Sequence, residues 1–130
     1  MALVSVIIPY FRKKSFIQKT LTSVLNQTFQ DFEIILIYDD EKKDDLVYIK
    51  KILNQNPKVN IIDNNRNLGA GLSRNIGIRK SSGSIIAFLD ADDYWVPERL
   101  EKQINFMMEK NYKFTFCNYK KKKWQRNQCF

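Results

Sequence analysis

The chain has 130 residues, 44% of them hydrophobic and 28% charged, and its formal net charge at neutral pH is +8. This length allows one domain with a sizeable core, and the composition is ordinary for a globular protein. The chain has no histidine, which excludes histidine general bases, serine or cysteine triads of the usual kind and most zinc sites.

The predicted elements begin with a buried strand over residues 4–8, which we expect Pro9 to end. Ser15 and Gln18 have the spacing of a capping box at the start of a helix. The apolar side chains that follow fall on one helix face: Ile17, Leu21, Val24 and Leu25.

Strand and helix patterns continue to alternate along the chain. Residues 33–38 and 59–62 predict two further strands. A helix preceded by acids lies between them, and another follows the third strand and two glycines. The apolar positions of these helices are Leu46, Ile49 and Leu53 in the first and Leu72 and Ile76 in the second.

The last predicted elements are a strand over 85–89, a helix with Pro97 as its first residue, and a strand over 114–119. The inner face of that helix is predicted to carry Leu100, Ile104, Met107 and Met108. Continuous apolar strands alternating with amphipathic helices predict an α/β fold with a mostly parallel open sheet and helices on both faces.

The positive charge is concentrated at the C-terminus. Residues 120–130 contain five basic residues and no acid, so they account for five of the eight net positive charges and leave three for residues 1–119. We therefore interpret 1–119 as the domain and 120–130 as a basic tail, non-native or disordered. A nucleic-acid binder driven by this tail is the least favoured reading, because aromatic residues are not interleaved with basic ones on one face.

No membrane span or secretory signal is predicted. The longest apolar runs are about five residues, far short of a bilayer span, and the N-terminus lacks a basic region before a long apolar one. Cys117 and Cys129 do not make a disulfide framework, and we expect Cys117 to be a buried small hydrophobe. These features favour a cytoplasmic protein, while peripheral membrane association and homo-oligomerisation stay open.

The most informative stretch is Asp90-Ala91-Asp92-Asp93, which directly follows the predicted strand 85–89. Three carboxylates at the end of a buried strand are costly unless they are neutralised. A hard cation, Mg²⁺ or Mn²⁺, prefers oxygen ligands and keeps positions open for phosphate oxygens. This pattern favours an enzyme acting on a diphosphate. The alternative is a surface turn that caps the next helix.

Other polar residues follow the other predicted strands. They are Pro9-Tyr10, Asp39-Asp40 and the loop over residues 64–69. Right-handed crossovers between parallel strands bring these ends to one edge, where ligands of open α/β sheets bind. We expect a single site built from these residues and the acidic stretch.

Several ordered motifs resemble those of the family 2 glycosyltransferases, which have the GT-A fold. The resemblance covers about residues 4–119. Its motifs are Val4-Ser5-Val6-Ile7-Ile8-Pro9, Gln27-Thr28-Phe29, Phe32-Glu33-Ile34-Ile35, Asn67-Leu68-Gly69, Ser73-Arg74-Asn75-Ile76-Gly77 and the stretch 83–93.

By this resemblance the chain is identified as a glycosyltransferase that binds a nucleotide-sugar, most often UDP-linked, with Mn²⁺ or Mg²⁺. The implied nucleotide-sugar ligands are Pro9, Tyr10, Asp39, Asp40, Arg74, Asp90 and Ala91, and the implied metal ligands are Asp92 and Asp93. Asp39 could instead cap the next helix, and Arg74 could be a solvated helix residue.

The chain departs from the family pattern in three places. The second strand ends in Tyr38-Asp39-Asp40-Glu41 where the family has two acids, Gly and Ser, and the first loop reads Tyr10-Phe11-Arg12 instead of Tyr-Asn. The family's second half binds the acceptor and supplies a carboxylate base for inverting transfer, but no acid follows Glu109. We therefore expect a donor-binding half.

Lys120 to Lys123 can be encoded by an adenine run where reading frames slip, so we interpret the chain as truncated. The family members build polysaccharides, glycolipids or glycoproteins. The alternative function is a non-catalytic module that binds a nucleotide-sugar or a metal.

Overall fold

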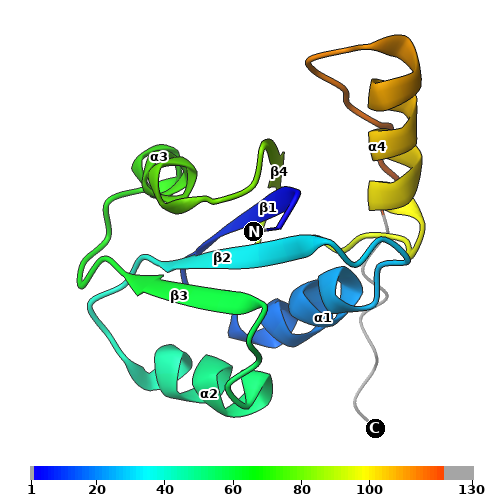
Figure 1. The fold of residues 1–130 in the computed structure, drawn as a ribbon. Coiled ribbons are helices and arrows are strands. Elements are labelled where there is room, and N and C mark those ends of the chain that lie inside the picture. The colour runs from blue at the N-terminus through cyan, green and yellow to red at the C-terminus, as the bar shows by residue number, and fades with distance from the viewer. Residues whose placement is uncertain (1, 122–130) are drawn as a thin grey trace, which may run out of the picture.

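The computed structural model describes residues 2–121 and contains four strands and four helices (Figure 1). In chain order they are β1 (Val4–Tyr10), α1 (Lys14–Leu25), β2 (Phe32–Tyr38), α2 (Asp44–Leu53), β3 (Val59–Asp63), α3 (Ala70–Lys80), β4 (Ile85–Phe88) and α4 (Arg99–Lys110).

The strands form one parallel sheet in the order β3-β2-β1-β4. The crossovers through α1 and α2 cover one face, and the crossover through α3 covers the other (Figure 1). The strand order therefore reverses between β1 and β4, which is the topological switch point of an open α/β sheet. The predicted α/β class, parallel sheet and two-sided helix cover are confirmed.

Two apolar clusters fill the space above and below the sheet, because successive side chains of a strand point to opposite faces. In β2, Ile34 and Leu36 join the larger cluster with α1 and α2. Ile35 and Ile37 join the smaller one, against which Ile76 of α3 packs. Every residue of β1 is buried, as expected for a central strand covered on both faces.

The strand β1 continues through Pro9, so the prediction that Pro9 ends it is wrong. Pro9 lies opposite Ile37 of β2 in the register. Residues 3 and 7 accept hydrogen bonds from the β4 side, whereas Tyr10 accepts one from Asp39 on the β2 side. By this alternation the missing N–H of Pro9 faces the β4 side, beyond the last paired residue of β4, and no ladder hydrogen bond is lost.

Helix α1 begins at Lys14, and no side chain caps it. The predicted capping box of Ser15 and Gln18 is therefore wrong, since Ser15 already lies inside the first turn. The predicted inner face is correct for Ile17, Leu21 and Val24, which are all buried.

Helix α4 begins at Arg99, two residues after Pro97, which the sequence had predicted as its first residue. The buried side chain of Gln27 determines this start. Its amide nitrogen donates to the Val96 carbonyl at 2.7 Å, and its carbonyl accepts from the Leu100 N–H at 2.9 Å. The Leu100 N–H, which has no acceptor within the helix, is therefore satisfied by the side chain of Gln27.

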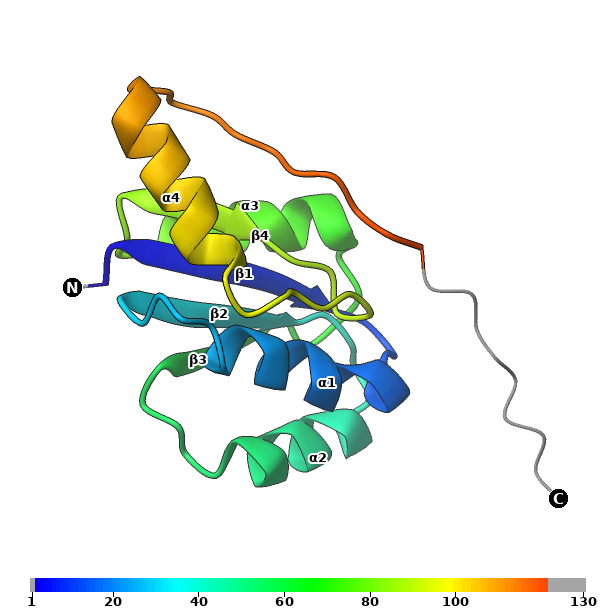
Figure 2. The same ribbon diagram turned by 90° about the vertical axis from the view of Figure 1, so that its right-hand side faces the viewer.

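The first turns of α4 pack on the core through Leu100 and Ile104, and the helix then rises away from the layers (Figure 2). Met107 is only half-buried and Met108 is exposed, which corrects their predicted place on an inner face. Residues 114–119 form no strand. Their alternating pattern has no strand beside it within residues 2–121, so Phe116 is exposed, as is Cys117, which was predicted to be buried.

Candidate functional site

The acidic stretch lies at the switch point of the sheet. The carboxyl ends of β1 and β4 are neighbours, because Ile7 pairs with Phe88 in the register. The chain leaves β1 at Tyr10 and leaves β4 at Phe88, so the loops 11–13 and 89–98 flank the same crevice. Ligands of open α/β sheets bind at this position.

Residues 90–93 form a turn closed by a hydrogen bond from the Asp93 N–H to the Asp90 carbonyl at 3.1 Å. The turn is fixed to α1 through Thr20, whose buried hydroxyl lies 2.9 Å from the Ala91 carbonyl and 2.6 Å from that of Asp93. Ala91 is buried against the core, whereas the carboxylates of Asp90 and Asp92 remain about half exposed.

Two cations from opposite faces of the sheet reach these carboxylates. The Arg74 guanidinium of α3 lies 2.7 Å from Asp90, and the Lys13 ammonium, just before α1, lies 2.9 Å from Asp92. Arg74 is partly exposed on α3 and faces the acidic turn, and its role toward the nucleotide stays a prediction.

Asp93 is the carboxylate that these two cations do not reach. Burial raises the pKa of Asp93, and the nearby charges of Asp92 and Asp90 raise it further. The charge of Arg99 opposes this shift only in part, so the ionised form of Asp93 is disfavoured.

The residues at this turn fit a Mg²⁺ or Mn²⁺ ion of the kind that is shared with a diphosphate. Within residues 2–121, no three carboxylate or thiol side chains converge into a complete protein cage. Such ions are usually held by only one or two carboxylates plus substrate phosphates and water. Asp92 and Asp93 can supply those carboxylates, so the donor set agrees with the predicted metal.

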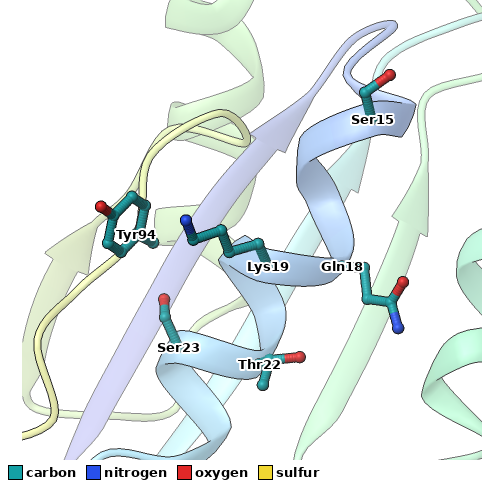
Figure 3. Close-up of a pocket in the computed structure, with 6 residues that line it drawn as sticks. All are labelled: Ser15, Gln18, Lys19, Thr22, Ser23 and Tyr94. Carbon is teal, nitrogen blue, oxygen red and sulfur yellow. The ribbon is translucent and has the colours of Figure 1, made fainter. Parts of the chain in front are cut away.

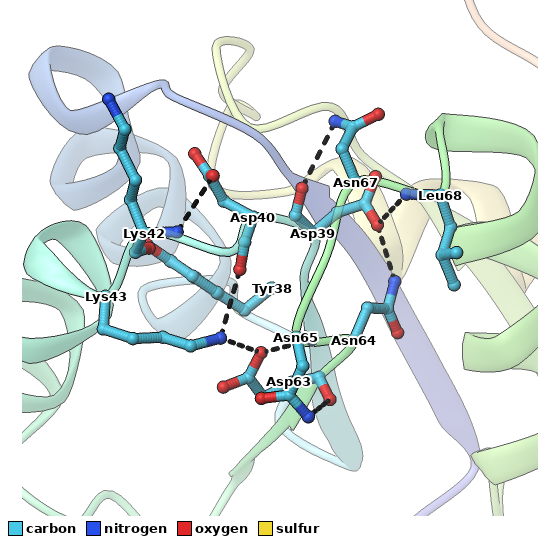
Figure 4. Close-up of polar contacts among 10 residues, drawn as sticks. All are labelled: Tyr38, Asp39, Asp40, Lys42, Lys43, Asp63, Asn64, Asn65, Asn67 and Leu68. Atoms are coloured by element: carbon cyan, nitrogen blue, oxygen red, sulfur yellow. Dashed lines mark hydrogen bonds and ion pairs between the residues drawn. The ribbon is translucent and has the colours of Figure 1, made fainter.

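Asp39 holds the loop that follows β3 (Figure 4). Its buried carboxylate accepts hydrogen bonds from the N–H groups of Leu68 and Gly69 at 2.8 Å each, and from the Asn64 amide at 2.7 Å. Asp39 therefore fixes the entry to α3 rather than capping α2, which was the alternative interpretation. This contact also places Asp39 between β2 and the glycine-containing loop.

Asp40 lines a hollow of about 230 Å³ between the ends of β1 and β2 and the start of α2. The Arg12 guanidinium lies 2.9 Å from its carboxylate and holds the pKa of Asp40 below its usual range. The Lys43 ammonium contacts the Asp40 carbonyl and pairs with Asp63 at 2.7 Å (Figure 4). The hollow is thus lined by both basic and acidic side chains, among them Arg12 and Asp40.

The predicted ligands Pro9 and Tyr10 are both buried. The Tyr10 ring stacks on that of Tyr38, and its hydroxyl donates to Asp45 at 2.7 Å. The ring therefore lies beneath the hollow rather than projecting into solvent.

A second, shallower hollow of about 440 Å³ lies on the outer side of α1 and contains none of the predicted site residues. In Figure 3 the Lys19 ammonium lies over the Tyr94 ring, 4.0 Å from its centroid. The hollow is lined by Ser15, Gln18, Lys19, Thr22, Ser23 and Tyr94.

The structure thus brings Arg74, Asp90, Asp92 and Asp93 together at the switch point and places Tyr10, Asp39 and Asp40 at the adjacent strand ends. Sequence reasoning missed Lys13, Arg12, Thr20 and Gln27. The basic loop after the first strand was a usable signal for Lys13 and Arg12, since neighbouring strand ends share an edge. No local pattern indicates that Thr20 and Gln27 hold the acidic loop.

An open parallel sheet with this strand order and an acidic crevice at its switch point defines a Rossmann-like α/β domain. The family follows from comparison with known proteins. The chain belongs to Glycosyl transferase family 2, whose family model matches residues 5–130, which confirms the recognition made from the motifs.

Relatives and solved structures resemble the chain over most of its length. It is 39% identical over 119 residues to the Escherichia coli UDP-Glc:alpha-D-GlcNAc-diphosphoundecaprenol beta-1,3-glucosyltransferase WfaP, covering 92% of this chain and 47% of that protein. It is 37% identical over 120 residues to the putative teichuronic acid biosynthesis glycosyltransferase TuaG of Bacillus subtilis, covering 90% of this chain and 46% of that protein.

The structure of Staphylococcus aureus TarS 1-349 in complex with UDP-GlcNAc matches with a TM-score of 0.74 and 28% identity, covering 84% of this chain and 32% of that one. The chain thus spans about half the length, or less, of the curated relatives it matches. Within residues 2–121, none of the helices has the length and apolar character needed to cross a bilayer.

Proposed function

We propose that this domain binds a UDP-linked sugar together with Mn²⁺ or Mg²⁺, and that it forms the donor site of a glycosyltransferase. The observation that carries the proposal is the acidic turn at the switch point, where Asp90 and Asp92 each form an ion pair and Asp93 forms none, with only a weaker attraction to Arg99. A divalent cation would supply the missing positive charge, and the anionic diphosphate bound with it would give Arg74 and Lys13 new partners.

Each residue has a role that its position supports. Asp92 and Asp93 would hold the metal, and Asp90 would accept hydroxyls of the ribose or sugar. Arg74, whose side chain is partly exposed, would exchange Asp90 for a phosphate oxygen. When bound, the metal would stabilise the charge that grows on the departing nucleoside diphosphate.

The nucleotide base would occupy the region at the ends of β1 and β2 beside the Asp39 carboxylate and the loop that follows β3. The second carboxylate oxygen of Asp39 accepts one hydrogen bond, from Gly69, and so retains capacity for a base N–H. Pro9 lies near the end of the neighbouring strand β1, and Asp40 follows Asp39 but faces the hollow beside α2. A UDP donor is supported by the UDP-GlcNAc complex of TarS and by the UDP-Glc specificity in the name of WfaP.

In the whole protein the reaction would be inverting transfer of a hexosyl or related group to an acceptor hydroxyl, with a carboxylate base outside this region. The relation to TuaG supports a role in polysaccharide synthesis. A non-catalytic binding module would share the donor site and lack turnover. A transfer assay on this chain beside a longer version would separate the two, since only an enzyme releases free nucleoside diphosphate when an acceptor is present.

Calorimetry with UDP, GDP and other nucleoside diphosphates, each with and without Mn²⁺ or Mg²⁺, tests the donor site. We expect metal-dependent binding with UDP the tightest. Affinity that does not depend on metal, or no affinity for any nucleotide, would refute the proposal.

A further inference from the structure

Lys13 occupies an unusual position relative to the proposed donor site. It lies on the three-residue connection between β1 and α1, and its ammonium crosses the switch point to Asp92, a residue that follows β4. The Lys13 carbonyl accepts the N–H groups of Phe16 and Ile17 at 3.0 Å each, so the backbone of Lys13 is fixed at the start of α1. The side chain is about half exposed and remains free to move.

The Lys13–Asp92 pair is incompatible with a metal on Asp92. A divalent cation bound to that carboxylate would lie within a few ångströms of the ammonium and would repel it. Lysine is a flexible point charge that binds phosphate well, and a diphosphate bridging the metal would present anionic oxygens within reach of the displaced side chain. Arg74 and Asp90 form an equivalent pair on the opposite face of the sheet.

We propose that Lys13 is a further donor-binding residue, which pairs with Asp92 in the empty domain and exchanges that carboxylate for a phosphate oxygen when the metal and nucleotide bind. This inference rests on the proposed donor site. It predicts effects of opposite sign for one substitution, because Lys13 competes with the metal alone but cooperates with the metal–nucleotide complex.

The test measures two affinities of the full chain. Mn²⁺ alone is followed by electron paramagnetic resonance, and UDP at a fixed saturating Mn²⁺ concentration is followed by calorimetry. Lys13→Met removes the charge and keeps the aliphatic stem. It should bind Mn²⁺ alone more tightly, by up to about fivefold, the range expected for losing a half-exposed ion pair. It should bind UDP about tenfold more weakly, from the loss of one charge-assisted contact.

Two matched variants isolate the geometry from the net charge. Lys14→Met removes the same charge from the next residue, whose ammonium lies over the Tyr48 ring at 5.2 Å and not at the switch point. It should change neither affinity. Lys13→Arg keeps the charge, so its affinities for Mn²⁺ alone and for UDP with Mn²⁺ should stay close to those of the wild-type chain. Circular dichroism should show the same fold for all three variants, since both lysines are exposed.

Several outcomes would overturn the inference. Unchanged or weaker Mn²⁺ binding in Lys13→Met would show that Lys13 does not compete for Asp92. Tighter Mn²⁺ binding with unchanged UDP affinity would show that Lys13 is not a phosphate ligand. Equal effects in Lys14→Met would show that the changes in affinity come from the net charge of the chain and not from the position of Lys13. A wild-type chain that binds Mn²⁺ but no nucleotide would instead refute the donor site, and the Mn²⁺ arm would still decide whether Lys13 and the metal compete.

Discussion

Tyr10 and Tyr38 stack at the adjacent carboxyl ends of β1 and β2, with ring centroids 5.4 Å apart and ring planes inclined by 14°. Both rings are buried, and each hydroxyl has a partner: Tyr10 donates to the Asp45 carboxylate and Tyr38 to the Lys42 carbonyl. The stacked rings lie beneath the hollow that Arg12 and Asp40 line. Tyr38 stands where the family pattern has an acid, so the stacked tyrosine pair departs from that pattern.

Removing the Tyr10 hydroxyl should destabilise the domain. Burial raises the pKa of Tyr10, and Asp45 raises it further, so the phenol stays neutral and donates its proton to that carboxylate. Tyr10→Phe should keep the stack and lower the free energy of unfolding by about 1–2 kcal/mol in urea titration. Tyr48→Phe, whose exposed hydroxyl makes a 3.3 Å contact, is the control and should stay within about 0.5 kcal/mol. Equal effects would contradict the role of the buried bond.

Two glycines should not tolerate alanine, because their backbones pack against β1. A Cβ at Gly83 would lie 2.7 Å from the Ser5 nitrogen, and one at Gly77 would lie 2.5 Å from the Cγ2 of buried Ile7. Each substitution should cost about 1–3 kcal/mol of unfolding free energy by thermal melting. Gly71→Ala is the control, since its Cβ would meet open space in a helix, and it should be neutral or stabilising. Wild-type melting of the Gly83 variant would contradict the close packing.

The sequence predicted the sheet and its helices well because the central strands β1 and β2 are covered on both faces and read as continuous apolar runs. The incorrect predictions concern element ends that depend on residues far away in the sequence. Pro9 stays in its strand because β4 has already ended beside it, and Pro97 lies outside its helix because Gln27 supplies the first acceptor. The alternating pattern of 114–119 was not sufficient for a strand, since a strand needs a hydrogen-bonded neighbour.

The acid sensitivity of the domain should depend on Asp40. Its hydrogen bond with Arg12 lowers the pKa of the folded state below the unfolded value of about 3.9. The stabilisation is therefore complete above the unfolded pKa and is lost as the pH falls through the folded pKa. Asp40→Asn should make the decline of unfolding free energy below about pH 4 shallower, while Asp31→Asn, at an exposed position, should leave it unchanged. A wild-type pH profile in Asp40→Asn would contradict this assignment.

Asp93 should have the opposite effect on stability. Its folded pKa is raised, so the folded state loses stability as the pH rises from the unfolded pKa through the folded one, and the full cost is present at neutral pH. Asp93→Asn should therefore raise the melting temperature at pH 7 in metal-free buffer. A lower melting temperature would show that the charge is compensated in the folded domain.

The sequence identified the acidic residues of the site, but we expected a metal ion to neutralise most of their negative charge. In the structure, Arg74 pairs with Asp90 and Lys13 pairs with Asp92. The carboxylates could be predicted because they directly follow an apolar strand, although β4 is only partly buried rather than buried as expected. Arg74 was predicted at the site, but the pairing of Lys13 with Asp92 was missed, because Lys13 lies 79 positions earlier in the chain and reaches Asp92 only through the adjacency of β1 and β4.

Calorimetric titration of UDP into Asp92→Ala in the presence of Mn²⁺, beside the wild-type chain and Asp31→Ala, tests the central claim most directly. Asp92 is half exposed and its side chain pairs with Lys13 at the surface, so its removal should leave the fold and the melting curve intact. The account predicts that metal-dependent UDP binding is lost in Asp92→Ala and retained in the wild-type chain and the Asp31→Ala control. Binding of UDP and Mn²⁺ by Asp92→Ala with wild-type affinity would contradict the donor site proposed at the switch point.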